Sequence, residues 1–199
     1  MKAISPIAGA IALILLAMGL ILYSNAPSHA VDDKVQAAFD SVVDETGKIS
    51  LPAEDYRSNW HLLGSWSIAG SEGAEGIHNV YTQPGVIEAF QNTGKFPDGA
   101  VLLKELLSAK TGDYSTGTVS YADELQGFFV MVKDENKRNR SEFKGNKLWG
   151  DGWGWAYFDA TDRENSTTAN YKMECKGCHV PARKTDWVFT EAYPVLLKK

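Results

Sequence analysis

Hydrophobic residues at helical spacing mark the first predicted element, an amphipathic helix over residues 31–47. The apolar positions recur every three or four residues, which gathers them on one side of a helix. Gly47 follows the last of them and is a natural C-terminal stop. The apolar positions in this stretch are Val35, Ala38, Phe39, Val42 and Val43.

Several later segments have the content of β-strands. Residues 60–68 and 77–82 are short and mix apolar with polar side chains, as a half-buried strand does. Residues 100–107 carry apolar side chains on both faces, which predicts a central, buried strand. Residues 127–132 are strongly apolar. Residues 149–160 combine aromatic side chains with glycines, where another group can approach the backbone closely.

Prolines, glycines and polar residues between these segments predict a short helix, a turn and a loop. Pro84 suits the start of a short helix over 86–92, and residues 94–99 are expected to turn because they hold two glycines and a proline. The polar residues 112–118 are expected to form a loop. Several strands and a few short helices predict an α+β fold, a single domain built on an antiparallel β-sheet.

The N-terminus carries an export signal. Lys2 precedes an apolar run from Ile7 to Tyr23, and small or polar residues follow it as far as Ala30. This order is typical of a secretory signal peptide, and we expect cleavage after Ala30. The run is also close to the length that spans a bilayer, so an uncleaved anchor helix stays open. Both alternatives place residues 31–199, the expected domain, outside the cytoplasm in the periplasm.

Charge and composition narrow the class of partner. The chain has a formal net charge of −5 and no run of basic residues. Because nucleic-acid binding needs a basic surface, we expect no nucleic-acid partner. The six tryptophans all follow the signal segment. Such a content of large aromatic side chains favours packing around a flat, apolar cofactor.

The two cysteines of the chain lie in one motif, Cys-Lys-Gly-Cys-His at residues 175–179. C-x-x-C-H is the attachment site of a c-type haem. Cys175 and Cys178 can each add across a haem vinyl group, and His179 can ligate the iron from the proximal side. A redox motif would be expected in a βαβ context, and a zinc site would need two more ligands nearby. A disulfide is the main alternative to one covalently bound haem c.

A second axial ligand is harder to find. No methionine follows Cys178, and Met173 is too close to the motif to reach across the ring. Met131 lies in an apolar strand, so we interpret it as a core residue. His61 and His78 lie in strand-like segments and are interpreted as structural histidines. The iron is therefore expected to keep an open position, as in haem proteins that bind or transform a small ligand.

Lys104 is the second informative residue. It lies in the middle of an apolar face of the strand over 100–107. A lysine there is costly unless it is paired or neutral. It could pair with Glu105, extend its amine past the end of the sheet, or have a function. The pattern alone leaves these three readings open.

Taken together, these residues resemble the cytochrome P-460 family over roughly residues 56–196. The resemblance implies a β-rich subunit, usually a homodimer, with one haem c and a histidine as the only protein ligand to the iron. It also implies a covalent bond from a haem meso carbon to a lysine, which matches Lys104. The landmarks are residues 80–81, 93–99, 101–106, 132–134, 175–179, 184–186 and 193–196.

The resemblance also implies a reaction. Family members of this kind oxidise hydroxylamine, giving nitrous oxide when nitric oxide is present, and pass the electrons to an acceptor, here a redox partner protein. Their distal glutamate lies three positions before the Val-Lys-Asp landmark, where this chain has Phe129. Phenylalanine cannot take a proton. Glu105, Glu124 or Asp151 could substitute, but the sequence does not place them over the iron.

That departure brings in a related group, cytochrome c′-β. This group shares the fold and the haem attachment, lacks the lysine bond, and binds nitric oxide or carbon monoxide in a pocket capped by phenylalanines. The chain combines the lysine of one group, Lys104, with a phenylalanine resembling the pocket of the other, Phe129. Two hypotheses follow: a hydroxylamine-oxidising oxidoreductase, or a non-catalytic binder of small gases. A plain electron carrier would need a sixth ligand.

Overall fold

The computed structural model describes residues 26–70, 75–135, 143 and 145–197. The predicted export signal lies mostly outside these residues. Residues 34–199 form one compact unit, and every described strand belongs to it. Within the described ranges, no helix is both long and apolar enough to cross a membrane.

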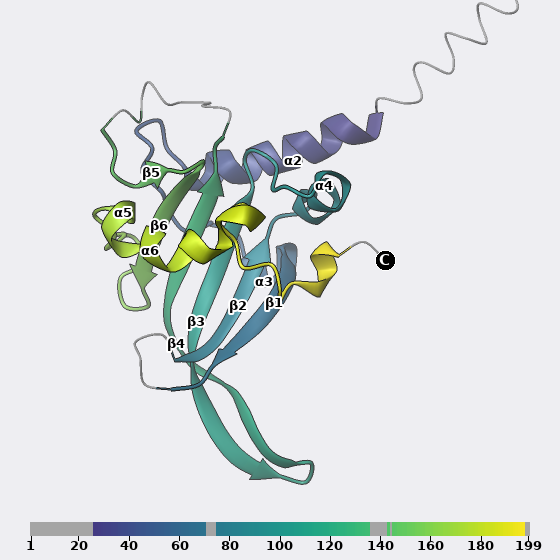
Figure 1. The fold of residues 1–199 in the computed structure, drawn as a ribbon, viewed down its shortest axis with the longest axis vertical. Coiled ribbons are helices and arrows are strands. Elements are labelled where there is room, and N and C mark those ends of the chain that lie inside the picture. Colours follow the sequence, from purple (N-terminus) through teal and green to yellow (C-terminus); the bar gives the residue numbers. More distant parts are fainter. Residues whose placement is uncertain (1–25, 71–74, 136–142, 144, 198–199) are drawn as a thin grey trace, which may run out of the picture. The chain divides into compact units, whose positions relative to one another are not determined.

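The described residues of this unit form an antiparallel sheet of six strands in the order β1-β2-β3-β4-β6-β5 (Figure 1). The strands are β1 His61–Ile68, β2 Gly76–Thr82, β3 Val101–Tyr114, β4 Gly117–Lys133, β5 Trp149–Gly150 and β6 Trp153–Asp159. The helices are α2 Ala26–Val42, α3 Tyr56–Asn59, α4 Val86–Thr93, α5 Tyr171–Glu174 and α6 Lys176–His179, followed by 3₁₀ segments η1 Val180–Thr185 and η2 Pro194–Leu196. The predicted α+β, antiparallel fold is confirmed.

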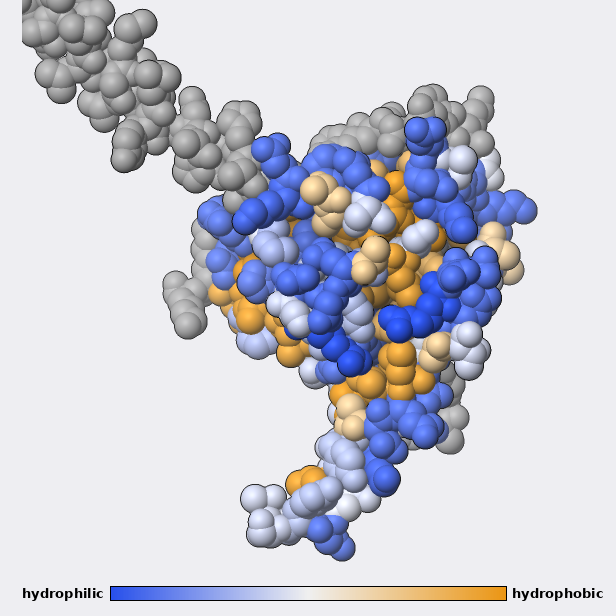
Figure 2. Space-filling model, turned by 180° about the vertical axis from the view of Figure 1, so that it is seen from behind, coloured by the Kyte–Doolittle hydropathy of each residue, from blue (hydrophilic) through white to orange (hydrophobic). Residues whose placement is uncertain are grey.

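The predicted loop over 112–118 is wrong. Strand β3 continues to Tyr114 and β4 begins at Gly117, so the two strands form a long hairpin that projects from the rest of the sheet (Figure 1). Figure 2 shows that this projection is mostly hydrophilic. Both of its faces meet solvent, so its residues lack the alternation of apolar and polar positions that would mark a strand.

The helix predicted over 31–47 also differs at both ends. It begins at Ala26 and ends at Val42, and the chain then turns. The turn is held by Asp44, whose carboxylate accepts hydrogen bonds from the backbone N–H groups of Thr46 and Lys48. Gly47 lies in this turn with a φ of 76°, a conformation that glycine adopts without cost. The prediction that Gly47 ends the helix is therefore wrong, because the helix ends at Val42 and Gly47 belongs to the turn that follows.

Side chains alternate along each strand, so the two faces of the sheet present different residues and pack against different segments. One face packs against the apolar side of α2 and forms the main core. The other face is crossed by the C-terminal segment that runs from α5 to η2 (Figure 1). The core face brings together Ala38, Phe39, Val42, Leu103, Phe128, Val130, Ala156 and Phe158.

Candidate functional site

A cavity of about 400 Å³ is lined by the second face of the sheet and the C-terminal segment. Its size falls within the range of cofactor sites, and most of its lining is apolar. The sheet contributes Trp66, Ile68, His78, Val80, Leu102, Lys104, Phe129, Met131 and Trp155. The C-terminal segment contributes Glu174, Cys175, Cys178, His179, Val188, Phe189 and Tyr193.

Four residues of the Cys-Lys-Gly-Cys-His motif, Lys176–His179, form the short helix α6, which follows Cys175, and both cysteines line the cavity. Asn170 caps the preceding helix α5 by accepting a hydrogen bond from the backbone N–H of Lys172. The two cysteines are not joined in a disulfide. Burial raises the pKa of the Cys175 thiol to about 11. Redox C-x-x-C motifs need a lowered thiol pKa, so this environment argues against that alternative.

His179 is oriented by the backbone of the segment that follows it. Its Nδ1 lies 2.7 Å from the carbonyl oxygen of Trp187, and its ring meets the edge of Trp155 with the centroids 4.8 Å apart. Because a carbonyl can only accept, Nδ1 donates, and the lone pair of Nε2 is left available to a metal. Burial lowers the pKa of His179, which also favours the neutral, metal-binding form.

Lys104 reaches the same cavity from the middle of the sheet. Its position is fixed by the register of β3, in which it lies between Val80 on β2 and Phe129 on β4. Its Nζ lies 4.4 Å from the centroid of the Phe129 ring. Desolvation lowers the pKa of the amine to about 8. A larger fraction of this lysine is therefore neutral and nucleophilic near neutral pH than of an exposed lysine.

Glu105 does not neutralise Lys104, because the two neighbours point to opposite faces of the sheet. Its buried carboxylate accepts hydrogen bonds from the Tyr56 hydroxyl and from Arg57 Nε at 2.7 Å. Arg57 Nη2 approaches the same oxygen to 2.6 Å. Burial and the adjacent carboxylate raise the pKa of Tyr56, so its hydroxyl stays protonated as the donor. This network joins α3 to β3 behind the cavity.

Phe129 lines the cavity and packs against Tyr157, with the ring centroids 4.7 Å apart. Its neighbour Phe128 points into the core on the opposite face. None of the three carboxylates considered as substitutes for a distal glutamate lines the cavity. Glu105 lies on the core face, Glu124 is exposed on the hairpin, and Asp151 is engaged by Lys176 at 2.8 Å.

His78 and Met131, interpreted from the sequence as a structural histidine and a core methionine, are both buried and also line the cavity. His61, by contrast, is exposed at the start of β1 and lies outside the lining. The alternation of side chains could have found both residues. His78 lies two positions before Val80 and Met131 two positions after Phe129, so each shares the face of a neighbour that lines the cavity.

These residues fit a covalently attached haem c. The cavity is apolar, both thiols reach it unpaired, and one histidine presents a free ring nitrogen with its other nitrogen already bonded. In the part of the chain that the structure describes, no group of three or more His, Cys, Asp or Glu side chains could hold a metal ion by itself.

Comparison with known proteins agrees with this chemistry. A family model described as Cytochrome P460 matches residues 53–190. The match includes Lys104, Phe129 and the whole motif at 175–179. A search of curated proteins found no match.

Proposed function

Because the chain belongs to the cytochrome P460 family and is a c-type haem cytochrome, we propose that it oxidises hydroxylamine and passes the electrons to a redox partner protein. The position of Lys104 carries this proposal. Its partly neutral amine shares one apolar cavity with Cys175, Cys178 and His179. A lysine so placed is available to bond the edge of a haem that these residues hold, as the family resemblance implies.

Each residue then has a distinct role. A bound haem would supply the iron that takes up hydroxylamine and the first acceptor for its electrons. Cys175 and Cys178 would hold the ring through thioether bonds, and His179 would ligate the iron. Lys104 would fix the ring edge at a third point. Phe129 excludes water from the space where the small nitrogenous ligand binds.

His78 is our candidate for the residue that accepts protons from the bound ligand. Besides the attachment motif, the titratable side chains that line the cavity are His78, Lys104, Glu174 and Tyr193. Burial raises the pKa of Tyr193 to about 12, so its hydroxyl stays protonated. Glu174 uses Oε1 to accept the backbone N–H groups of Ala169 and Asn170. Lys104 is assigned to the haem edge. A histidine is also the side chain best matched to proton transfer near neutral pH.

Phe129 supports an alternative function, the reversible binding of nitric oxide or carbon monoxide. An apolar side chain replaces the glutamate of the hydroxylamine-oxidising members, and the sheet contributes no carboxylate side chain to the lining. Such a lining disfavours charged or strongly hydrogen-bonded ligands and favours diatomic gases. In this alternative the protein is not an enzyme, and Phe129 shields the iron.

The proposal also covers the cellular location of the protein and its oligomeric state. The apolar run Ile7–Tyr23 and the small residues before Val31 support export to the periplasm through a cleaved signal peptide. Covalent haem attachment is consistent with a compartment outside the cytoplasm. The family resemblance supports a homodimer.

Anaerobic turnover of hydroxylamine with an artificial electron acceptor tests the function. The haem-loaded protein is expected to turn over, and His78→Gln is expected to lower kcat by ~100-fold or more. His61→Gln is the matched control, because His61 is exposed and lies outside the cavity, so it should leave kcat unchanged. A wild-type protein that binds nitric oxide but shows no turnover would replace this proposal with the gas-binding alternative.

A further inference from the structure

The segment that orients His179 contains two consecutive residues in the left-handed region. Asp186 has a φ of 60° and Trp187 a φ of 67°. This conformation is uncommon for any residue except glycine and strained for a bulky one, so the surroundings must hold it in place. The left-handed turn directs the carbonyl of Trp187 toward Nδ1 of His179.

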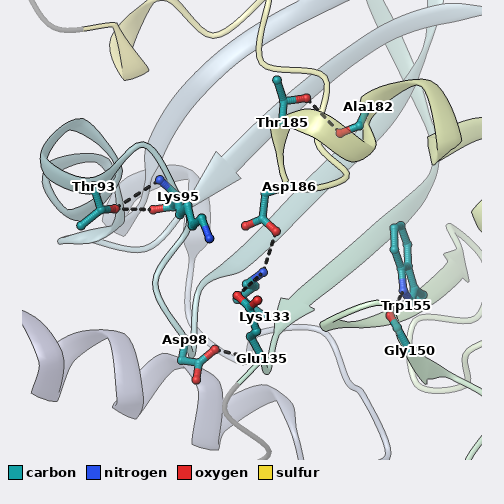
Figure 3. Close-up of polar contacts among 10 residues, drawn as sticks. All are labelled: Thr93, Lys95, Asp98, Lys133, Glu135, Gly150, Trp155, Ala182, Thr185 and Asp186. Carbon is teal, nitrogen blue, oxygen red and sulfur yellow. Dashed lines mark hydrogen bonds and ion pairs between the residues drawn. The ribbon is translucent and has the colours of Figure 1, made fainter.

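Local hydrogen bonds hold one side of this turn. The backbone N–H of Trp187 donates to the carbonyl of Ala182 at 2.9 Å. The hydroxyl of Thr185 lies 3.0 Å from the same carbonyl (Figure 3) and 2.8 Å from that of Val188. These contacts lie within the C-terminal segment, so by themselves they do not tie the turn to the sheet.

Lys133, the last residue of β4, makes that connection. Its Nζ lies 2.6 Å from a carboxylate oxygen of Asp186 (Figure 3) and 3.3 Å from Glu135. Only 2% of the lysine side chain is exposed. Its backbone is held as well, because its N–H donates to Ala100 and its carbonyl accepts from Gly99. A buried charge is costly unless it is paired, so the lysine and the turn depend on each other.

We propose that Lys133 is a positioning residue for the proximal histidine. Through Asp186 it holds the left-handed turn in the place where the Trp187 carbonyl accepts the Nδ1–H of His179. This role rests on haem attachment alone, and it holds whether the protein oxidises hydroxylamine or binds a gas.

The hydrogen bond has a measurable effect on a bound iron. A histidine that donates Nδ1–H to a carbonyl is a more basic ligand. A more basic ligand favours ferric iron, lowers the midpoint potential and raises the frequency of the iron–histidine stretch. Loss of the positioning contact should therefore raise the potential and lower the stretching frequency.

The charges alone predict a different pattern. Removing the charge of Lys133 leaves the Asp186 anion near the haem, which by itself would lower the potential. Removing the charge of Asp186 leaves the Lys133 cation, which by itself would raise it. If positioning dominates, the two single substitutions move the potential in the same direction. If only charge matters, they move it in opposite directions.

The test uses haem-loaded Lys133→Met, Asp186→Asn and the double variant. Midpoint potentials come from a spectroelectrochemical titration, and the iron–histidine stretch comes from resonance Raman spectra of the ferrous protein. Asp186→Asn keeps a residue that tolerates the left-handed region, so this variant loads haem even where Lys133→Met does not. The exposed hairpin pair Lys110–Asp123, 3.9 Å apart, provides the control variants Lys110→Met and Asp123→Asn.

We expect every variant of the Lys133–Asp186 pair that loads haem to show a raised potential and a lowered stretching frequency, and we expect no change in the controls. An unchanged stretching frequency, or potentials that move in opposite directions, would overturn the proposal. A loss of thermal stability with an unchanged midpoint potential and an unchanged stretching frequency would overturn it too. The Lys133–Asp186 pair would then be a structural contact without an effect on His179.

Discussion

In the ion pair between Arg57 and Glu105, one side chain is buried and the other is exposed. This difference lets us predict how substitutions of each residue change the stability of the protein. The side chain of Glu105 is 1% exposed and that of Arg57 is 55% exposed. Arg57→Met strands a carboxylate inside the protein, with the hydroxyls of Tyr56 and Tyr81 as the donors that stay. Glu105→Gln instead leaves a guanidinium that water can reach.

The expected costs follow from what each variant leaves unpaired. Breaking a buried pair by removing one partner typically costs 3–5 kcal/mol, so Arg57→Met should cost about 3 kcal/mol, at the lower end because the tyrosine contact stays. Glu105→Gln should cost about 1.5 kcal/mol, since charge-assisted hydrogen bonds become neutral ones. The double variant strands no charge and should cost about 2 kcal/mol, well below the sum of the single variants.

Urea unfolding of the haem-loaded protein, followed by far-ultraviolet circular dichroism, measures these free energies. For a domain of this size, a loss of 1 kcal/mol lowers Tm by roughly 2–4 °C, which gives an independent check. The absorption spectrum should not change, because the network lies on the sheet face opposite the cavity. Additive costs, or a larger loss for Glu105→Gln than for Arg57→Met, would refute the assignment of the buried charge.

Two further predictions concern the cavity. Phe129→Glu is expected to create or raise hydroxylamine oxidation, because a carboxylate can take the proton that phenylalanine cannot; an unchanged rate in a correctly folded variant would count against the role of this position. The pKa of Lys104 is lowered to about 8, so its neutral fraction rises with pH around 8 rather than around 10.5. Bonding the amine to a haem meso carbon removes two electrons and two protons, so a fixed amount of a two-electron oxidant such as peroxide is supplied. The yield of haem peptide linked to Lys104 at a fixed reaction time, measured by mass spectrometry, should therefore reach half its maximum near pH 8. A half-maximum near pH 10 would contradict the desolvated environment.

Local signals in the sequence were enough for the attachment motif and for most strands. Cys175, Cys178 and His179 are contiguous, so their chemistry needs no knowledge of the fold. Lys104 could be recognised as unusual because alternation places it on an apolar face. Alternation also excludes Glu105 as its partner, since adjacent residues of a strand point to opposite faces. The long hairpin was missed because strands with two solvated faces carry no such signal.

Contacts between distant segments could not be read from the chain. Lys133 and Asp186 are 53 residues apart, and nothing local pairs them. The left-handed turn at Asp186 and Trp187 contains no glycine, so the sequence does not predict it. His78 and Met131 were interpreted as structural and core residues. An apolar neighbour in the same strand shows that a sheet face is buried, but it does not show whether that face packs against a helix or lines a cavity. Only the position of the C-terminal segment over that face decides between the two.

We propose that Lys104 and the motif at 175–179 hold the same haem. Proteolytic digestion of the haem-loaded protein, followed by mass spectrometry of the haem peptides, tests it most directly. We predict one haem joined both to the peptide that contains Cys175 and Cys178 and to the peptide that contains Lys104. A haem joined to the cysteines alone would contradict the role of Lys104 and favour the gas-binding alternative, and a protein without any haem adduct would contradict the whole account.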